Sequence, residues 1–428
     1  MFEVVFMTFK KTDILLPKFS KDSEKMKKWS VVACDQYTSE PEYWNAVSSF
    51  VGEEKSTLRL TIPEIYLNDE DIDKRIENTN KIMNEYMDED VFAVHKDSYI
   101  YVERTLANGV KRLGIVGAVD LEDYDYNKGS ETKVRATEGT VISRIPPRLK
   151  VRNNAIIELP HIMLLIDDEN CDIIESNSKI KDAFEKVYDF DMMQSSGHIA
   201  GYKMSKEAAE RLDKKLAALD DIDAFNKKYG VKKDSPLIYA MGDGNHSLAT
   251  AKAYYENLKK EIGDEAKNSP ARYALCELVN LHDASLEFEA IHRVVFGLDA
   301  DAFLAAFEKE YAISYDENAS GQSFIFVAGG KGKKVTITNP SEYLTVATLQ
   351  KFIDSYIEKN GGEVDYIHGE DVVYKLCTDS ANFGMILDAM DKSDLYKSVI
   401  IDGALPRKTS SMGEACDKRF YTEARKIK

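Results

Sequence analysis

The chain has 428 residues, with an apolar content of 43% and an aromatic content of 10%, which is typical of a folded protein with a sizeable core and two or three domains. Its formal net charge of −17 argues against broad, non-specific binding of nucleic acid, which needs a basic surface. No secretory signal pattern, membrane-spanning stretch or C-x-x-C cysteine pair is present. We therefore expect a cytoplasmic protein without a membrane part, disulfide framework or structural zinc.

Strand-like and helical patterns alternate along the chain. In order, we predict strands over 59–66 and 91–103 with a helix over 71–87 between them, strands over 112–121 and 162–166, a helix over 206–230 and a hairpin over 322–339. Gly230 closes the helix at a position where glycine commonly adopts the left-handed conformation. This mixture predicts an α/β fold (α+β mixed), with helices packed on a mixed sheet.

Composition shifts suggest three regions. Weak boundaries fall near residue 230 and in the polar stretch "ENASGQ" at 317–322. We predict an N-terminal α/β region over 1–230, a central region over 231–320 and a C-terminal α/β region over 321–428 that ends in a basic loop.

The stretch "LIYAMGDGNHSLATAK", residues 237–252, carries an unusual group of polar residues. An apolar run is followed by Gly242, Asp243, Gly244, Asn245 and His246. After them, apolar residues recur at the spacing of one face of a helix: Leu248, Ala251, Tyr255, Leu258 and Ile262. We predict a loop over 242–247 and a helix that starts near Ser247. Free backbone N–H groups at a helix N-terminus favour an anion, often phosphate, and glycines permit close approach of a ligand. The spacing and lysine of a Walker A loop are absent.

Two interpretations of this turn stay open. In the functional one, Asp243 holds a metal or a substrate hydroxyl and His246 acts as a donor or as an acid–base group. In the structural one, Asp243 or Ser247 only caps the helix and His246 is a surface residue.

Two further segments carry groups suited to phosphate chemistry. In "RATEGT", Glu138 can orient an accepting hydroxyl while Arg135 and Thr140 bind phosphate; the alternative is a short solvent-facing helix ended by Pro146 and Pro147. In "LPRKTSSMG", the donors are Arg407, Lys408, Thr409 and Ser410. There the alternative is a solvated loop before a last helix, with Ser411 and Glu414 as a capping box.

His292 and Arg293 lie in "FEAIHRVVF", which has the alternation of a strand. They are secondary candidates for the site, and a structural pair between His292 and a carboxylate explains the histidine equally well.

The turn resembles the D-G-H-H-R signature of the bacterial and archaeal "domain of unknown function 1015" family, and related turns occur in ParB-type folds and in free-serine kinases built on that fold. Asp243, Gly244 and His246 match the signature, while Asn245 and Ser247 stand where the family has histidine and arginine. The segments "ILLPK…WSVVACDQY", "RATEGT", "AIHRVV" and "LPRKTSSMG" resemble other family segments in the expected order.

The resemblance and the residues together predict a small-molecule phosphotransferase that uses ATP or ADP and magnesium, with Asp243 as a metal ligand. The acceptor would be a small hydroxyl compound, and the likeness to free-serine kinases implies free serine as a candidate. The expected catalytic residues are Glu138, Asp243 and His246, and the expected phosphate or nucleotide ligands are Arg135, Thr140, Gly242, Gly244, Asn245, Arg407, Lys408, Thr409 and Ser410. Glu138, Asp243 and Lys408 should then converge on one cleft.

Two other functions remain open: a non-catalytic, ParB-like nucleotide-binding regulator and a hydrolase of a phosphorylated metabolite. The expected partner is a small molecule, neither nucleic acid nor a membrane is expected, and a homodimer is compatible with the sequence.

Overall fold

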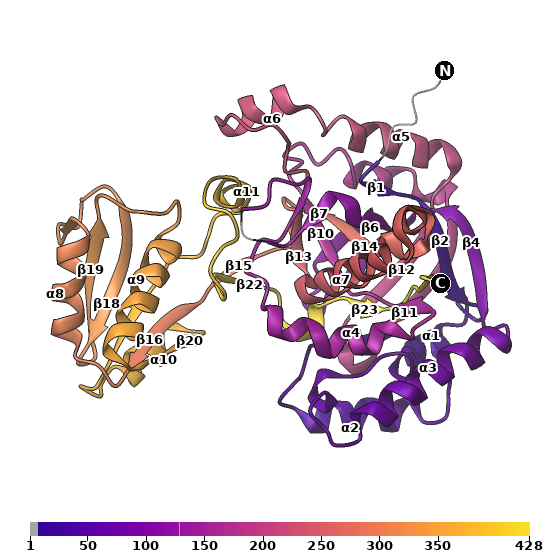
Figure 1. The fold of residues 1–428 in the computed structure, drawn as a ribbon, viewed down its shortest axis with the longest axis horizontal. Coiled ribbons are helices and arrows are strands. Elements are labelled where there is room, and N and C mark those ends of the chain that lie inside the picture. The colour runs from indigo at the N-terminus through magenta and orange to yellow at the C-terminus, as the bar shows by residue number, and fades with distance from the viewer. Residues whose placement is uncertain (1–6, 128) are drawn as a thin grey trace. The chain divides into compact units, whose positions relative to one another are not determined.

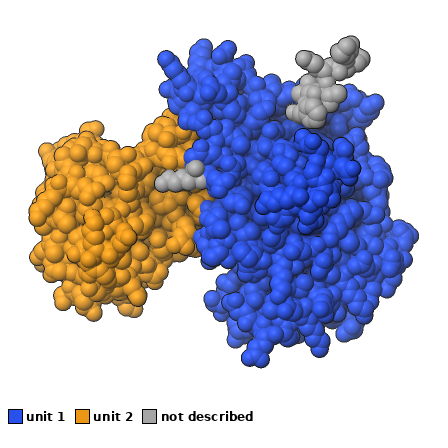
Figure 2. Space-filling view, in the orientation of Figure 1, with its two compact units in different colours: residues 1–136, 140–286, 414–428 blue, residues 137–139, 287–413 orange. Residues whose placement is uncertain are grey.

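A computed structural model describes residues 7–127 and 129–428 (Figure 1). The chain forms two compact units, coloured blue and orange in Figure 2. Unit 1 comprises the chain up to Ala136, Thr140–Leu286 and Glu414–Lys428, and unit 2 comprises Thr137–Gly139 and Glu287–Gly413. The two units differ from the three predicted regions, because residue 230 lies inside unit 1 and residues 317–322 lie inside unit 2. The first six residues of the chain and Lys128 lie outside the described residues.

Unit 1 is built on a mixed sheet in the order β11-β12-β5-β6-β14-β10-β13-β8-β7, with β1 also paired to β6. Its strands are β1 (Phe9–Lys10), β5 (Ile100–Thr105), β6 (Lys111–Asp120), β7 (Tyr124–Asp125), β8 (Val134–Arg135), β10 (Met163–Ile166), β11 (Glu185–Asp191), β12 (His198–Lys203), β13 (Tyr239–Asp243) and β14 (Tyr273–Asn280). Strand β10 runs parallel to β14 and antiparallel to β13, which confirms the predicted α/β class with a mixed sheet.

Helices and short strand pairs cover the two faces of this sheet (Figure 1). The helices are α1 (Ser23–Trp29), α2 (Pro41–Val51), α3 (Ile72–Asp88), α4 (Ile145–Asn153), α5 (Lys206–Ala217), α6 (Ile222–Tyr229) and α7 (Asn245–Ile262). The strand pairs are β2 (Thr12–Pro17) with β4 (Phe92–Ser98), β3 (Val31–Val32) with β23 (Phe420–Tyr421), and β9 (Ile157–Glu158) with β24 (Arg425–Lys426).

Side chains alternate along the strands between two apolar cores, as the period of a strand requires. On β5, Tyr101 joins the core that contains Leu248 and Tyr255 of α7. Its neighbours Ile100 and Val102 join the other core, which contains both tryptophans and the C-terminal residues Phe420 and Tyr421. The sheet is therefore buried on both faces, and the end of the chain is part of the interior of unit 1.

Unit 2 has an antiparallel sheet in the order β17-β19-β18-β21-β16-β20. Its strands are β17 (Ile313–Ser314), β18 (Gln322–Ala328), β19 (Lys331–Ile337), β16 (His292–Phe296), β20 (Glu363–Ile367) and β21 (Asn382–Ile386), and a separate pair joins β15 (Phe288–Ala290) to β22 (Ser410–Met412). Its helices are α8 (Ala300–Glu310), α9 (Thr345–Asn360), α10 (Glu370–Leu376) and α11 (Lys392–Ile401). One core cluster contains residues of α8 and α9, and another contains residues of α10.

Most predicted elements with a clear period are confirmed. They include the helix over 71–87, the strands over 112–121 and 162–166, and the hairpin over 322–339. The predicted strand over 59–66 is wrong: Arg59 ends one short 3₁₀ turn (Thr57–Arg59), and Glu64–Tyr66 form another. The predicted helix over 206–230 is two helices, because Asp221 accepts hydrogen bonds from two backbone N–H groups and starts α6. Gly230 ends α6 in the left-handed conformation, as predicted.

Candidate functional site

The polar turn lies between β13 and α7 and is tighter than predicted. Gly242 and Asp243 are the last residues of β13, Gly244 alone forms the turn, and α7 starts at Asn245. Asp243 pairs with Met163 of β10, which extends the strand up to the turn. Gly244 has φ +80°, and a Cβ there would lie 2.9 Å from Cα of Ile162. Glycine is therefore required at this position both by the conformation and by the space.

The N-terminus of α7 has no side-chain cap, so neither Asp243 nor Ser247 caps this helix in the way that the structural interpretation expected; the functional interpretation of the turn stays a prediction. Oδ1 of Asp243 accepts a hydrogen bond from the N–H of Gly244 at 2.9 Å, and Ser247 lies within the first turn of the helix. An α-helix leaves its first backbone N–H groups without intrahelical acceptors. With no side chain in the capping role, this helix end presents donors and a partial positive charge to an anion.

His246 and two arginines surround this helix end with polar groups. Burial, and after it the positive charges of Arg148 and Arg144, lower the pKa of His246 to about 4, so its imidazole is neutral near pH 7. The Nε2 atom of His246 is buried and has no hydrogen-bond partner in the described part of the chain. A buried ring nitrogen without a partner has the character of a group that meets a ligand or water.

A buried chain of polar groups lies beside the turn. Nε2 of His161 is 3.3 Å from a carboxylate oxygen of Asp35, and its Nδ1 is 2.9 Å from the hydroxyl of Tyr421. Burial alone would lower the pKa of His161, but the carboxylates of Asp35, Asp243 and Glu64 together outweigh burial and raise it. The charge on His161 in turn lowers the pKa of Asp35 against the opposite effect of burial. The two side chains therefore form an ion pair below the raised pKa of His161.

Cys34 also contacts this chain, because its backbone N–H donates to the hydroxyl of Tyr421 at 3.1 Å. Burial raises the pKa of the Cys34 thiol to about 12. The thiol is therefore protonated near pH 7 and is not an activated nucleophile.

The C-terminal segment, Glu414–Lys428, completes the site although it is distant in sequence. Nζ of Lys418 is 3.5 Å from Oδ2 of Asp243, and Tyr421 supplies the hydroxyl next to His161. Two buried arginines hold the segment: Arg104 donates to the carbonyl of Cys416 at 2.9 Å, and Arg112 donates to the carbonyl of Asp417 at 3.0 Å. The chain thus returns to unit 1 after unit 2 and places one cation and one hydroxyl at the turn.

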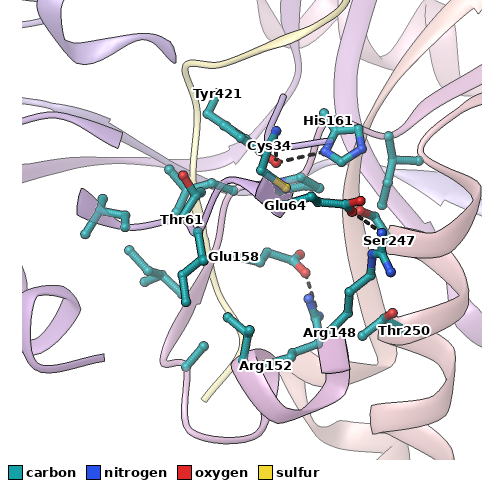
Figure 3. A pocket seen from close by; sticks show the side chains of 18 of the residues that line it. Cys34, Thr61, Glu64, Arg148, Arg152, Glu158, His161, Ser247, Thr250 and Tyr421 are labelled. Carbon is teal, nitrogen blue, oxygen red and sulfur yellow. Dashed lines mark hydrogen bonds and ion pairs between the residues drawn. The ribbon is translucent and has the colours of Figure 1, made fainter. Parts of the chain in front are cut away.

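A cavity of about 150 Å³ opens beside these groups, within unit 1 (Figure 3). Cys34, His161 and Tyr421 line one side of it, and Ser247 and Thr250 of α7 line another. Two arginines rise into it from α4: Arg148 reaches Glu64, and Arg152 reaches Glu158 with an N···O distance of 2.6 Å (Figure 3).

Asp243 is the residue predicted to bind magnesium. Within residues 7–127 and 129–428, no group of three or more His, Cys, Asp and Glu side chains is arranged to hold a metal ion. Magnesium usually keeps several waters and takes one or two protein carboxylates together with substrate phosphates. Asp243 fits that limited role, beside a helix end that favours phosphate, but a site built from protein groups alone is not supported.

The "RATEGT" segment divides between the two units. Thr140 lies in unit 1, and its hydroxyl is 3.3 Å from the side-chain oxygen of Asn245, so this residue contacts the turn, while its binding of phosphate stays a prediction. Arg135 is buried in β8 and donates to the carbonyls of Thr132 and Ser235, which indicates a structural role rather than phosphate binding. Pro146 and Pro147 begin α4 rather than ending a helix, because proline is well suited to the first helical turn.

Glu138 and the basic loop both belong to unit 2. Glu138 forms a β-bridge with Leu405, next to the loop that carries Arg407 and Lys408. Because Asp243 belongs to unit 1, the predicted convergence of Glu138, Asp243 and Lys408 on one cleft stays a prediction.

Several groups of the basic loop have structural partners. The hydroxyl of Thr409 donates to the carbonyl of Pro406 at 2.7 Å, and Ser410 lies in β22. The predicted last helix is wrong for the described residues: Ser411 lies in β22, and Glu414 precedes a single 3₁₀ turn (Ala415–Asp417) without capping it through its side chain.

His292 and Arg293 form the start of β16, as their alternation predicted. Nδ1 of His292 accepts from the N–H of Leu387 at 3.2 Å. Arg293 is fully buried and donates to the side chain of Gln350 and to backbone carbonyls. Both residues thus have structural partners within unit 2.

Sequence reasoning missed Asp35, His161, Lys418 and Tyr421. A signal for His161 was present, because it and Glu158 interrupt the most apolar stretch of the chain, "IIELPHIMLLI". Asp35 lies in the family-like segment "WSVVACDQY". Nothing local marks Lys418 or Tyr421, since only the path of the chain through unit 2 returns them to the turn.

Comparisons with known proteins place the chain in a family. It matches the family described as "Protein of unknown function (DUF1015)" over residues 16–356, and a comparison with curated proteins finds no significant match. Solved structures that resemble it include a free serine kinase in complex with AMP, with 11% identity, a TM-score of 0.38 and coverage of 72% of this chain and 91% of that one.

Two other solved structures are similarly remote. A conserved hypothetical protein from Pyrococcus furiosus shares 10% identity at a TM-score of 0.35, covering 71% of this chain and 92% of that one. SbnI with a C-terminal truncation, from Staphylococcus aureus, shares 8% identity at a TM-score of 0.36, covering 70% and 82%. At TM-scores below 0.5, nothing about the activity of this chain follows from these likenesses. No helix of the described residues is long and apolar enough to cross a membrane. Because the family match spans most of the chain, the protein belongs to the DUF1015 family.

Proposed function

We propose that the protein transfers a phosphoryl group from ATP or ADP to a small hydroxyl compound, at the N-terminus of α7. The observation that carries the proposal is the uncapped end of an 18-residue helix, joined to a strand by a single glycine and flanked by Asp243, His246 and Lys418. This combination provides backbone donors for phosphate oxygens, a carboxylate and a cation, which are the groups that phosphoryl transfer uses.

The charges around the turn suit a transferred phosphoryl group. The loose transition state spreads negative charge over three equatorial oxygens, and catalysis depends mainly on positioned donors and cations. Arg144 and Arg148 are close enough to depress the pKa of His246, and Lys418 lies against Asp243. A neutral His246 can donate or accept a hydrogen bond at this position without adding a further charge.

Asp243 would hold magnesium only together with the nucleotide. When bound, magnesium neutralises phosphate charge and orients the phosphates. The residues of this chain then have two tasks: the backbone donors of α7 bind phosphate oxygens, and a carboxylate orients the accepting hydroxyl. Asp35 and Asp243 are two carboxylates of unit 1 near the turn. Glu138, the choice made from the sequence, belongs to unit 2, and its part in the reaction remains a prediction.

An assay of nucleotide turnover tests this proposal. The protein is incubated with magnesium and ATP or ADP, with and without a pool of small hydroxyl compounds that includes serine. Turnover that depends on an acceptor is the expected result. Turnover without an acceptor would indicate a hydrolase instead, and binding without turnover would indicate a nucleotide-binding regulator.

Two variants attribute the activity to the site. Asp243→Asn should abolish the turnover. Asp264→Asn is the matched control, because it removes a carboxylate that is 92% exposed and lies just after α7. Equal activity in both variants would contradict the assignment of the site.

A further inference from the structure

We infer that the cavity beside α7 selects an accepting alcohol with a compact apolar body, of about the size of a benzene ring. This inference rests on the proposed function for the fate of the hydroxyl group, but the binding that it describes can be measured without any nucleotide. It concerns a class of ligand more apolar than free serine.

The size of the cavity sets the size of the ligand. Its volume is about 150 Å³, and an engineered apolar cavity of that volume in another protein binds benzene. A body of roughly six to eight non-hydrogen atoms therefore fits. A nucleoside is much larger, so this cavity suits the acceptor rather than the nucleotide.

The wall of the cavity is largely apolar. Half of the residues that line it are apolar, among them Leu60, Ile62, Met83, Val151 and Ile157. Most of them belong to well-buried parts of the core, and Met83 and Ile157 are less than 5% exposed. Each methylene that moves from water into such surroundings improves affinity roughly fourfold. A polar ligand such as serine or glycerol gains little from this wall.

The charges in the wall are already paired. Arg148 contacts Glu64, and Arg152 contacts Glu158 at 2.6 Å, so each guanidinium in the cavity is balanced by a carboxylate. An ion pair of this kind does not select for a ligand of either charge. Nε of Arg152 is buried without a hydrogen-bond partner among the described residues, and it offers one donor to a neutral oxygen.

The polar groups in the wall of the cavity would orient a bound ligand. Ser247, in the first turn of α7, and Thr250, one turn further on, line it on one side. The ring of His161 also lines the cavity (Figure 3). A ligand whose apolar body lies against Leu60 and Met83 can therefore direct its hydroxyl to the helix end at which we propose that phosphate binds. The acceptor would thus be a primary alcohol on an apolar ring or branched chain.

Binding is tested with a graded set of alcohols and the full-length protein, in the absence of nucleotide. Benzyl alcohol and 3-methyl-1-butanol are the apolar probes, and glycerol and serine are the polar ones. Saturation-transfer NMR gives the affinities, and the ¹³C-methyl signal of Met83, assigned with Met83→Leu, reports occupation of the cavity. We expect both apolar alcohols to shift the Met83 signal and to bind at least tenfold more tightly than glycerol or serine.

Filling the cavity should remove this binding. Ile62→Trp should weaken the binding of benzyl alcohol at least tenfold, while Val94→Trp, at a strand position that is 45% exposed, should leave it unchanged. Val151→Phe, at a half-buried position of α4, also fills the cavity and replaces Ile62→Trp in this test if that variant does not fold.

Three outcomes would overturn the inference: an unshifted Met83 signal, polar probes that bind as tightly as apolar ones, or unchanged binding in a folded, filled variant. A different result would refute the proposed function. In that case the apolar alcohols bind in the cavity, but no nucleotide is consumed in their presence. Turnover with serine, without any binding of the apolar alcohols, would instead support the proposed phosphotransferase activity and refute the ligand class inferred for the cavity.

Discussion

Removing one hydroxyl group, in Tyr421→Phe, should destabilise unit 1 by about 3 kcal/mol. The hydroxyl is 2.9 Å from Nδ1 of His161 and accepts from the N–H of Cys34 at 3.1 Å. Phenylalanine keeps the ring in place, so both groups lose their partner without a change of packing. Each buried polar group that is left unpaired costs about 1–3 kcal/mol. The costs for the two groups add, but water from the adjoining cavity can form a hydrogen bond with one of them. The expected loss of stability therefore lies in the lower half of the range for two unpaired groups.

Equilibrium urea unfolding followed by tryptophan fluorescence measures this change. Both tryptophans, Trp29 and Trp44, are buried in the core of unit 1 that contains Tyr421, so the signal reports on this unit. Tyr86→Phe is the matched control: its hydroxyl accepts a single hydrogen bond, from the N–H of Ser56 at 3.2 Å, and about half the effect is expected. A loss of less than about 0.5 kcal/mol in Tyr421→Phe would refute the reasoning that its two partners depend on the hydroxyl.

The remaining predictions concern the turn and the C-terminal segment. Asp243→Asn should abolish turnover while the melting temperature stays within a few degrees of the wild-type value, because Asp243 does not cap α7; a large drop in melting temperature with activity retained would show a structural role. NMR titration of His246 should give a midpoint near pH 4, and a midpoint near 6.5 would contradict its burial. Because this folded-state pKa lies below the unfolded one, the contribution of His246 to stability is complete above about pH 6.5 and is lost as the pH falls towards 4. Arg104→Met should loosen residues 414–428, seen as faster hydrogen exchange there, with a stability loss of about 3 kcal/mol because the carbonyls of Ser196 and Cys416 lose their donor; unchanged exchange would show that Arg104 does not hold this segment.

Local patterns were enough to predict much of the fold. The helix over 71–87 and the strand over 112–121 have clear periods, and Gly230 ends its helix in the conformation that glycine favours. Predictions failed where a short-range preference competed with the pattern. Asp221 interrupts a strongly helical sequence because its side chain binds two backbone N–H groups, and residues 59–66 are apolar enough for a strand but contribute to two short 3₁₀ turns.

The site could be predicted only in part, because its groups come from distant segments. The turn around Asp243 carries a local signal in its glycines and polar residues, and Thr140, from another candidate segment, contacts it. Arg135 looked like a phosphate ligand but binds backbone carbonyls, which only the packing of β8 reveals. Lys418 and Tyr421 reach the turn because the chain returns to unit 1 after unit 2, and no pattern near them in the sequence indicates that path.

Hydrogen exchange of the amides in the first turn of α7, measured with and without ADP and magnesium, tests whether phosphate binds at this helix end. If phosphate binds at this helix end, residues 244–248 should be protected in the presence of ADP, and the protection should be lost in Lys418→Met, which removes the cation next to Asp243. Inorganic phosphate at high concentration should protect the same amides more weakly. Binding of ADP that leaves these amides unchanged would show that the nucleotide binds elsewhere on the chain and that this helix end is not its phosphate site.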